Sequence, residues 1–388
     1  MRADSDGTEG YSMKSVELHW VVDSPSPYNT QLFEHITRNT DWKLLVHYKN
    51  MSLGTHPWKS ELTKSHPARS MQPRFGIDWQ LVLTALKGRN DQTTKWFVVG
   101  SWNDLNSWLV FVVLILRRGN LALWTDTPNQ VRKRNFFKKK LRAVSLKWLL
   151  RRCTYVMGTG KPAVDVLKDM GARPESVVNF PYWINVEAPL VSIGSDAPER
   201  PLIFMSTGLI LNHRKGHDMV IRAIAELCDS DQPRFEYWIA GTGPDEAALR
   251  ILASELGVLD QVRFLGWVEP DSLPGFLQKA DVFIHPSPIL EPYGVAVIEA
   301  MAAQLPILAS DLTCAALDRI VEGESGFIHT AGDYRALAQH MAVFLAEPGR
   351  AATMGRTALD TAQQWPMSRA ISILQEMFSI TRIRNKSL

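Results

Sequence analysis

The chain has 388 residues, of which 45% are hydrophobic and 21% are charged, and this balance excludes a disordered or collagen-like protein. Its length favours two domains, each with a full-sized core. The formal net charge of +3 is too small by itself to indicate nucleic-acid binding. Cys153, Cys228 and Cys314 form neither a metal-spaced pair nor a disulfide framework, which favours a reducing compartment.

No segment of the sequence is suited to export or to crossing a bilayer. Residues 1–15 are polar and contain no apolar region of a secretory signal. The longest apolar stretch, residues 108–116, has nine residues against the roughly 20 that span a bilayer, so it predicts a buried helix. We therefore expect a cytoplasmic protein.

Short apolar runs predict buried strands along most of the chain. In the first half these runs cover residues 16–22, 43–47, 95–99, 121–124 and 155–158. After residue 200, strands predicted at 202–206, 236–240, 262–265, 282–285 and 306–310 alternate with helices around 218–227, 245–255, 272–279 and 295–303. Strict alternation of this kind predicts α/β architecture, with parallel sheets covered by helices on both faces.

The predicted domain boundary is a stretch of residues 179–201 that contains four prolines and has no periodicity. We expect one α/β domain over residues 1–186, a second over 187–364 and a separate helical segment over 365–388. Glycine-rich strand ends in two facing α/β domains make the cleft between them the expected ligand site.

A phosphate-binding pattern follows the strand predicted at 202–206. Residues 206–208 read Ser-Thr-Gly, and Arg214 and Lys215 precede Gly216 at a helix start. A strand end that leads through glycine to a helix N-terminus, beside two cations, suits a phosphate or diphosphate. Taken alone, the feature fits a solvated turn equally well.

Two further glycine features follow the next two strands. Residues 240–244 read Ala-Gly-Thr-Gly-Pro, a tight turn that lacks the third glycine and the acidic partner of a dinucleotide fingerprint. Gly266, Trp267 and Val268 follow the strand predicted at 262–265, where backbone beside a glycine could face a flat base. A simple strand end explains this second feature equally well.

The strongest pattern is a pair of glutamates around a helix start. Glu291 stands in a loop, and Glu299 stands about one turn into the helix predicted from residue 295. The backbone N–H groups of Gly294 and Val295 lie at that helix N-terminus, which stabilises anionic ligands. One carboxylate is expected to bind hydroxyl groups of the sugar, and the other is expected to bind the ribose hydroxyls of the same nucleotide. A surface charge at Glu299 is disfavoured by its apolar neighbours, which are Val297, Ile298, Ala300 and Met301.

In this order, the features resemble the donor domain of the retaining GT-B glycosyltransferases, the large family 4. The resemblance covers residues 200–345 and is carried by residues 214–216, the turn at 240–244, the two glutamates and the stretch at 299–306. It implies two Rossmann-like domains facing across a cleft, a nucleotide-diphospho-sugar donor, and no required metal or cofactor. Residues 365–380 also resemble the family's closing helix, which crosses back onto the first domain.

The resemblance implies roles for single residues. It would make Glu291 the catalytic carboxylate near the transferred sugar, Glu299 the ribose clamp, and Arg214 and Lys215 the diphosphate cations. Backbone amides of Gly294 and Val295 would face the diphosphate. The remaining implied positions are a nucleobase side at Gly266, Trp267 and Val268, and a donor-side turn at Gly241 and Tyr293.

The sequence departs from the family in one place. Family members often carry an arginine shortly after the first glycine of this segment, where Leu209 and Ile210 follow Gly208 here. Arg214 is expected to supply the second charge from a different position. Diphosphate binding is therefore expected to rest mainly on Lys215.

The first half of the chain offers one further acid. Asp126 follows the strand predicted at 121–124 and is the only acid from Arg117 to Arg152, a segment with 12 lysines and arginines. It is a candidate catalytic residue that orients an acceptor hydroxyl. A cap for the next turn is an equally good interpretation.

Residues 117–152 combine this basic charge with interleaved aromatic residues. Charge of one sign with aromatics suits an anionic membrane surface, at about 1 kcal/mol for each basic residue near it. A lipid-diphosphate acceptor belongs to the same interpretation, and a solvated face is the main alternative. Nucleic-acid binding is the least favoured.

Together these patterns predict a retaining, metal-independent glycosyltransferase that uses a UDP- or GDP-linked sugar and a glycan or lipid-linked acceptor. The expected setting is assembly of a lipid-linked surface polysaccharide, with the protein cytoplasmic or peripheral on the inner membrane. A GT-B sugar-nucleotide epimerase and a non-catalytic binder of nucleotide sugars or nucleic acid are the alternatives. The base, sugar, acceptor and linkage depend on a few hydroxyl contacts that one sequence does not place.

Overall fold

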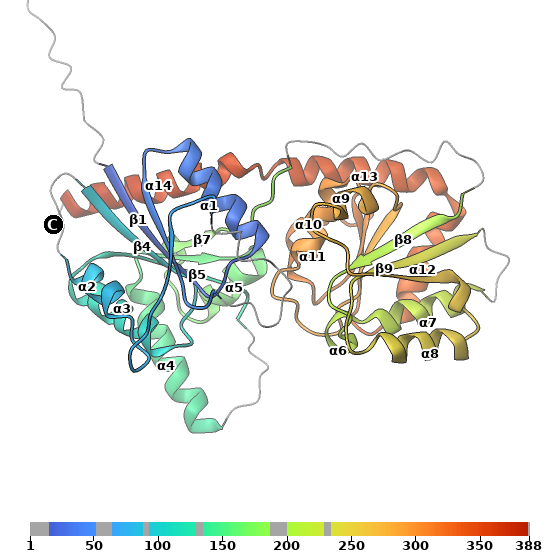
Figure 1. Cartoon of the computed structure of the whole chain (residues 1–388), viewed down its shortest axis with the longest axis horizontal. Helices are drawn as coiled ribbons and strands as arrows, with labels where there is room; N and C mark the ends of the chain where they lie inside the picture. Colours follow the sequence, from blue (N-terminus) through green and yellow to red (C-terminus); the bar gives the residue numbers. More distant parts are fainter. Residues whose placement is uncertain are drawn as a thin grey trace, which may run out of the picture. The chain divides into compact units, whose positions relative to one another are not determined.

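The structure is a computed structural model that describes residues 15–51, 64–87, 93–128, 135–186, 200–228 and 234–386. Within these ranges the chain forms two parallel β-sheets, with helices between most successive strands (Figure 1). The predicted α/β class with two Rossmann-like sheets is thereby confirmed. The expectation that two domains face each other across a cleft stays a prediction.

The first sheet has seven strands in the order β3-β2-β1-β4-β5-β6-β7. The chain leaves β1 towards one edge and then returns to β4 on its other side, so a switch point lies between β1 and β4. The strands are β1 (Ser15–Val22), β2 (Lys43–Tyr48), β3 (Ala68–Ser70), β4 (Thr93–Val99), β5 (Asn120–Thr125), β6 (Tyr155–Gly158) and β7 (Val177–Asn179). The helices between them are α1 (Pro27–Asn39), α2 (Trp79–Leu86), α3 (Leu105–Leu116), α4 (Phe136–Arg152), α5 (Lys161–Asp169) and the short η2 (Pro174–Ser176).

The second sheet has six strands in the order β10-β9-β8-β11-β12-β13, with its switch point between β8 and β11. The strands are β8 (Leu202–Thr207), β9 (Phe235–Ala240), β10 (Val262–Gly266), β11 (Val282–His285), β12 (Ile307–Ser310) and β13 (Gly326–His329). The helices are α6 (Asn212–Lys215), α7 (His217–Cys228), α8 (Glu246–Glu255), η3 (Leu259–Gln261), α9 (Leu273–Leu277), α10 (Val295–Ala302), α11 (Cys314–Arg319), α12 (Tyr334–Ala346), α13 (Pro348–Gln363) and α14 (Met367–Lys386).

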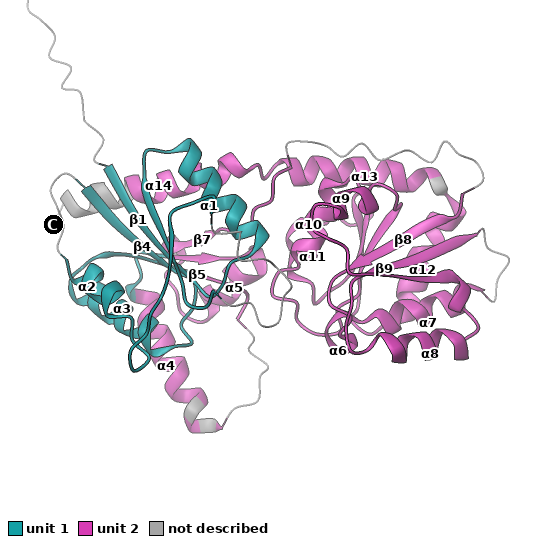
Figure 2. Ribbon diagram, viewed as in Figure 1, with its two compact units in different colours: residues 1–124, 152–155 teal, residues 125–151, 156–388 magenta. Residues whose placement is uncertain are grey.

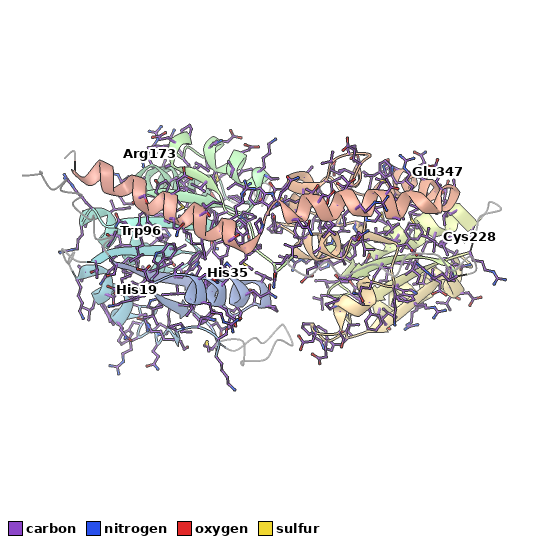
Figure 3. The ribbon with its side chains drawn as sticks, turned by 90° about the horizontal axis from the view of Figure 1, so that it is seen from above. His19, His35, Trp96, Arg173, Cys228 and Glu347 are labelled. Carbon is purple, nitrogen blue, oxygen red and sulfur yellow. The ribbon has the colours of Figure 1, made fainter. Side chains whose placement is uncertain are left out.

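Helices cover the second sheet, and large side chains fill both cores. Helix α7 packs against α8 and α12, whereas α10 packs against α11 and α13 (Figure 1). The largest buried side chains include Trp20 and Trp96 in the first sheet and Phe204 and Phe283 in the second. Figure 3 shows Trp96 and His19 among the strands of the first sheet. Burial of this kind supplies most of the stability of such layers.

Local sequence explains where several helices start. Ser26 accepts a hydrogen bond from the backbone N–H of Asn29 at the start of α1, and Pro27 occupies the first turn. Asp104 accepts from the backbone N–H of Ser107 in the same way, so α3 starts three residues before the predicted apolar stretch. That stretch is a helix, as predicted, but only one of its faces is buried, through Val110, Phe111 and Leu114.

Most predicted strands and helices are confirmed to within one to three residues, but three strands were not predicted. These are β3, β7 and β13, which have three or four residues each and lie at or near sheet edges. Such short strands carry too few side chains for an alternating pattern to emerge. The three cysteines are all free, with Cys153 and Cys314 buried and Cys228 exposed.

By its internal contacts the chain divides into two compact units (Figure 2). Unit 1 comprises residues 1–124 and 152–155, and unit 2 comprises residues 125–151 and 156–388. The predicted boundary at residue 186 stays a prediction, because residues 187–199 lie outside the described part of the chain. The helix predicted near the C-terminus is α14, and its return to the first domain also stays a prediction.

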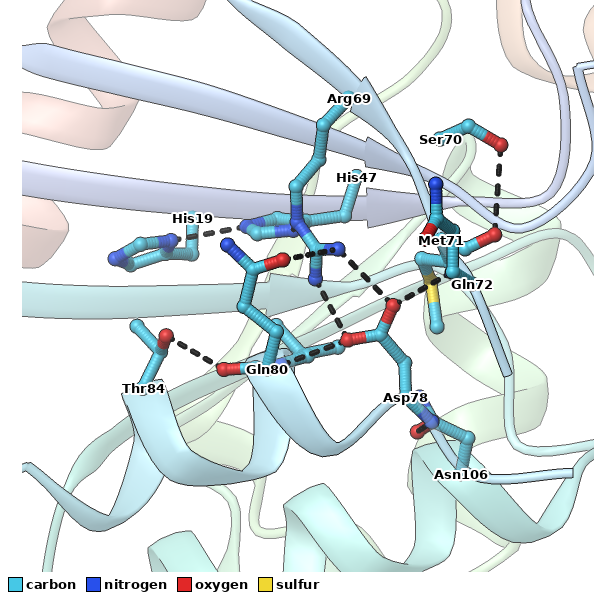
Figure 4. A network of polar contacts seen from close by, with 11 residues as sticks. His19, His47, Arg69, Ser70, Met71, Gln72, Asp78, Gln80, Thr84 and Asn106 are labelled. Atoms are coloured by element: carbon cyan, nitrogen blue, oxygen red, sulfur yellow. Dashed lines mark hydrogen bonds and ion pairs between the residues drawn. The ribbon is translucent and has the colours of Figure 1, made fainter. Parts of the chain in front are cut away.

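A chain of hydrogen bonds crosses β1, β2 and β3 in unit 1 (Figure 4). Arg69 Nε donates to His47 Nδ1 at 2.7 Å, His47 Nε2 lies 2.9 Å from His19 Nδ1, and His19 Nε2 lies 2.8 Å from Glu17 Oε1. The Arg69 guanidinium can only donate hydrogen bonds, and the Glu17 carboxylate can only accept them. All three hydrogen bonds therefore form together when both imidazole rings are neutral and each carries its proton on Nε2. The Arg69 guanidinium also forms a bidentate pair with Asp78.

Candidate active site

The loops that follow β8, β9 and β10 are held together by their backbones. The N–H of Gly208 donates to the carbonyl of Ala240 at 2.9 Å, and the N–H of Gly241 donates to the carbonyl of Gly266 at 2.8 Å. A Cβ atom on Gly241 would lie only 1.8 Å from the Gly208 carbonyl oxygen. The glycine turn in the sequence therefore reflects close packing of loops at the carboxyl edge of the sheet.

Lys215 and Glu291 meet at the switch point between β8 and β11. Lys215 Nζ donates to Glu291 Oε2 at 2.7 Å, and the side chains are 20% and 13% exposed. Lys215 is placed by Gly216, which ends α6 in the left-handed conformation with φ of 68°. A Cβ atom there would lie 2.3 Å from the carbonyl oxygen of Pro286, so only glycine fits.

The Glu291 loop is fixed by backbone pairing with the segment after β12. The N–H of Glu291 donates to Leu312, and its carbonyl accepts from the N–H of Cys314. Burial raises the pKa of the Glu291 carboxyl, but His285 and Lys215 more than offset this and lower it to about 2. Glu291 is thus an ionised carboxylate across the physiological pH range.

Helix α10 starts beside this carboxylate. Gly294 precedes the helix with φ of 93° and contributes no capping side chain. If Gly294 carried a Cβ atom, that atom would lie 3.5 Å from Glu291 Cγ. The start of the helix is therefore close to the Glu291 side chain. The first backbone N–H groups of a helix have no partner within it. Gly294 and Val295 therefore lie where the sequence predicts an anion site, and that role stays a prediction.

Glu299 lies in the second turn of α10 and has no hydrogen bond or ion pair with any residue in the described ranges. Burial raises the pKa of its carboxyl to about 6. The residue is half-buried, and a partly desolvated carboxylate without a protein partner is unfavourable for stability. The position is suited to an external hydrogen-bond donor such as a pair of hydroxyl groups.

The remaining donor-side candidates lie in different surroundings. Arg214 is exposed, its backbone N–H donates to the carbonyl of Leu211 at 2.9 Å, and its carbonyl accepts from the Ser287 hydroxyl at 2.6 Å. Trp267 is 43% exposed, and Val268 beside it is half-buried. The ring of Tyr293 is buried, and its hydroxyl donates to Asp318 at 3.4 Å. The sequence predicted Tyr293 only as part of a donor-side turn and did not predict its contact with Asp318.

Asp126 and its neighbour Thr127 belong to unit 2 and reach the Glu291 loop. Asp126 Oδ1 accepts from the Tyr182 hydroxyl at 2.8 Å and from the Thr159 hydroxyl at 3.2 Å. Thr127 Oγ1 donates to the carbonyl of Pro292, the residue after Glu291, at 3.2 Å. The loop after β5 therefore touches the loop after β11, and the two acids stand on adjoining loops.

The comparison with protein families agrees with this geometry. Residues 194–361 match the family model described as glycosyl transferases group 1. This segment belongs to that family. It contains Lys215, Glu291, Glu299 and the switch point between β8 and β11.

Curated relatives of this group 1 domain are themselves sugar transferases by name. The GDP-mannose-dependent alpha-(1-6)-phosphatidylinositol monomannoside mannosyltransferase of Mycolicibacterium smegmatis is 32% identical over 163 residues, covering 40% of this chain and 42% of the relative. The D-inositol 3-phosphate glycosyltransferase of Corynebacterium aurimucosum is 31% identical over 244 residues, covering 58% and 56%. The chain thus spans about half the length of these relatives, or less.

Among solved structures, the crystal structure of Anabaena Alr3699/HepE in complex with UDP is similar over nearly the whole chain. The TM-score is 0.74 at 18% sequence identity, with 94% of this chain and 99% of that chain covered. At this identity the likeness shows a shared fold. The fold is the GT-B fold of glycosyltransferases, in agreement with the prediction for the group 1 domain and its neighbour.

Three polar residues around the group 1 site were missed by the sequence analysis. His285 ends the apolar strand β11, Tyr182 lies in the proline-rich stretch, and Asp318 lies in α11. Only the position of His285, directly before the Pro-Ser-Pro segment, was visible in the sequence. The contacts of the other two depend on tertiary packing.

Within the described ranges, no group of three His, Cys, Asp or Glu side chains is arranged to hold a metal ion. The predicted independence of metals stays a prediction. None of the helices in these ranges has both the length and the apolar character needed to cross a membrane.

Proposed function

We propose that the protein is a retaining glycosyltransferase that moves a sugar from a nucleotide-diphospho-sugar to an acceptor. The observation that carries the proposal is the arrangement around α10. An ionised Glu291 held by Lys215 stands at the start of this helix, and Glu299, which has no partner among the described residues, stands one turn further on. A cation, a helix N-terminus and two separated carboxylates match the charge pattern of a nucleotide sugar.

In this proposal, each part of the donor has its own residues. The diphosphate is bound by Lys215 and Arg214 and by the backbone amides of Gly294 and Val295. The Glu299 carboxylate accepts hydrogen bonds from ribose hydroxyls. The backbone of Gly266 and Val268, with Trp267, lies beside the base, and the turn at Gly241 supports that side. The cation and the helix dipole stabilise the leaving diphosphate, which makes a metal unnecessary.

Glu291 and Asp126 are the proposed catalytic residues. Glu291 binds hydroxyls of the transferred sugar, and Asp126 orients the acceptor hydroxyl. The departing phosphate oxygen then takes the acceptor proton on the face where the new bond forms, so the anomeric configuration is retained. The contact between Thr127 and Pro292 supports this pairing, because it brings the two acidic loops together.

The donor nucleotide is proposed to be UDP or GDP. One curated relative is GDP-mannose-dependent by name, and the similar Anabaena structure holds UDP. Other relatives are named as putative colanic acid biosynthesis glycosyltransferases, for example in Escherichia coli, which supports a role in surface polysaccharide assembly. We propose a glycan or lipid-linked acceptor on the same grounds.

Thermal-shift titration with UDP, GDP, ADP and dTDP sugars tests the donor site. We expect one nucleotide to raise the melting temperature of the wild type, and Glu299→Ala and Lys215→Ala to lose the shift. Incubation with acceptor extracts, followed by anomeric assignment of the product by NMR, then tests transfer with retention. An isomerised donor with no acceptor product indicates the epimerase alternative, and binding without turnover indicates a binding module.

We also propose that α4 places the protein on an anionic membrane surface. Phe137, Leu141, Val144 and Trp148 are 78%, 72%, 62% and 37% exposed and recur at intervals of four, three and four residues. This spacing puts them on one face of the helix. Exposed lysines and arginines flank that face, namely Lys140, Lys147, Arg151 and Arg152. An apolar stripe rimmed by cations is typical of helices that lie in the headgroup region.

Liposome flotation tests this placement. We expect binding to vesicles with anionic lipid at low salt, weakened by salt and by changing Lys138, Lys139 and Lys140 to Glu. Leu141→Ser with Val144→Ser should also weaken it, whereas Ile251→Ser, at a 60% exposed position on α8, should not. The absence of flotation at low salt would refute the membrane proposal and leave the donor site untouched.

A further inference from the structure

His285 has a ring nitrogen without a partner beside the proposed donor site. The residue ends β11 and is 4% exposed by its side chain. Within the described ranges, its Nε2 atom has no hydrogen-bond partner. Glu291 Oε2 lies 3.9 Å away, which is beyond hydrogen-bond distance. A buried polar nitrogen in this state costs stability, so a functional reason for it is worth seeking.

A glycine lies beside both the imidazole of His285 and the side chain of Glu291. The position of a Cβ atom on Gly294 lies 3.6 Å from His285 Nε2 and 3.5 Å from Glu291 Cγ. A side chain there would therefore touch both His285 and Glu291. A shift of about 1 Å by either side chain brings Nε2 and Oε2 within hydrogen-bond distance.

The present partner of Glu291 is also the proposed partner of the donor. Glu291 Oε2 accepts from Lys215 Nζ at 2.7 Å, and the proposed function assigns Lys215 to the diphosphate. A diphosphate carries more charge than the carboxylate and draws the ammonium towards itself. Glu291, which is 13% exposed, then needs another hydrogen-bond donor to stay ionised and oriented.

We propose that His285 is a positioning residue, whose Nε2–H donates to Glu291 when Lys215 turns to the donor diphosphate. The inference rests on the proposed function and names the group that holds its catalytic carboxylate. A neutral imidazole is suited to the task, because it supplies an N–H group without adding a cation that competes for the diphosphate. Burial lowers the pKa of His285 and outweighs the opposing effect of Glu291, and Lys215 lowers it further, so the ring is neutral at physiological pH.

NMR of protein with ¹⁵N-labelled histidine tests the contact without relying on turnover. We expect the ring nitrogens of His285 to show the proton on Nε2, and this proton to move downfield as UDP or GDP saturates the site. Lys215→Met should produce the same change without nucleotide, since it removes the competing donor. A His285 signal that stays unchanged both at saturation and in Lys215→Met would overturn the inference.

Kinetics with two variants separate positioning from packing. His285→Phe keeps a ring and removes the N–H, whereas His285→Gln keeps an N–H near the position of Nε2. We expect His285→Phe to lower kcat by about tenfold or more with KM for the donor within about twofold, and His285→Gln to recover most of the loss. His329→Phe is the matched control, because His329 is a buried histidine on β13 with an unpartnered Nδ1.

The outcomes distinguish this inference from the proposed function. Equal losses of kcat in His285→Phe and His285→Gln, or wild-type kcat in both, overturn the positioning role while transfer itself stands. If the wild type transfers no sugar from any nucleotide sugar, the proposed function fails. The NMR titration then still decides whether His285 moves to Glu291.

Discussion

At the scale of single residues, two carboxylates near one helix start are held in different electrostatic states. Lys215 and His285 lower the pKa of Glu291 to about 2 against the effect of burial. Glu299 has no such partners, and burial raises its pKa to about 6. Separation of two neighbouring acids in this way is a common means of giving them different roles.

Glu299 is expected to lower the stability of the folded protein at neutral pH, because its carboxylate is placed for binding the donor. The pKa of Glu299 in the folded protein lies above the value of 4.5 for an unperturbed glutamate, so the folded state favours the protonated carboxyl. The stability that this protonated form provides is complete below pH 4.5 and is lost as pH rises through 6. At pH 7.5 the cost is about 2 kcal/mol. Glu299→Gln should therefore be more stable than the wild type at pH 7.5 by about 1–2 kcal/mol, with no gain at pH 4.

Urea unfolding of both proteins at the two pH values measures this difference. The same variant should lose the melting-temperature shift that a nucleotide sugar gives the wild type. A Glu299→Gln protein that is less stable than the wild type at pH 7.5 would show that the carboxylate has a stabilising partner after all.

Lys215 should matter for both stability and binding, whereas Arg214 should matter for binding alone. Lys215→Met leaves Glu291 largely buried without its cation, which costs about 2–4 kcal/mol. The folded pKa of Glu291 is lowered, so the ion pair stabilises above pH 4.5 and is lost as pH falls towards 2. Arg214→Met is the matched control, since that side chain is exposed.

Denaturant unfolding at pH 7.5 compares the two variants with the wild type, and nucleotide titration follows their affinity. Equal stability losses in Lys215→Met and Arg214→Met would mean that the Lys215–Glu291 pair contributes nothing specific.

At the scale of elements, the first sheet is tied together by the two histidines of β1 and β2. His47 accepts a hydrogen bond from Arg69 and contacts His19 (Figure 4). His19 in turn contacts Glu17. The groups that face the pair also include Lys95 and Asp78. Each ring has one acceptor and one donor in use, so a further proton on either ring breaks a hydrogen bond of the chain.

Stability of the first sheet should therefore fall in mild acid. Burial, assisted by Arg69 and His19, lowers the pKa of His47 to about 3. Below pH 6.5 the unfolded histidine binds a proton that the folded one does not, so stability present above pH 6.5 falls as pH decreases towards 3. At pH 5 this loss is about 2 kcal/mol for His47.

His47→Gln should be less stable than the wild type at pH 7.5 but should lose less on acidification from pH 6.5 to 5. Thermal melting at several pH values measures the two slopes, with His213→Gln as a control at an exposed histidine. Glu17 and Asp78, whose pKa values are lowered, lose their contributions only at lower pH. Identical slopes in wild type and His47→Gln would refute the assignment.

At the scale of the whole molecule, Asp318 links distant parts of unit 2. Its Oδ1 accepts from the backbone N–H of Lys161 at 2.7 Å and from the Asn179 side chain at 3.4 Å. Its Oδ2 lies 3.0 Å from Arg319 Nε, and the Arg319 guanidinium stacks on Trp365 at 3.8 Å. One carboxylate thus joins α5, β7, α11 and the segment between α13 and α14.

Asp318→Asn is expected to destabilise unit 2 by about 3–5 kcal/mol, because it leaves the buried Arg319 cation without its counter-charge. Differential scanning calorimetry should show a lower and broader transition. Glu324→Gln, at an exposed position in the same region, should melt like the wild type. A wild-type melting profile for Asp318→Asn would mean that the remaining contacts join these elements without the charge.

The sequence by itself determined the alternation of strands and helices, the two parallel sheets and the positions of Lys215, Glu291 and Glu299 at strand and helix ends. These follow from periodicity and from glycine and proline positions, which act over a few residues. Only the tertiary structure decided that Lys215 pairs with Glu291, that Glu299 lacks a partner within the described part of the chain, and that His285 and Asp318 contribute contacts. Those facts depend on contacts between residues far apart in the chain, and on burial, which determines the charge state of each carboxylate.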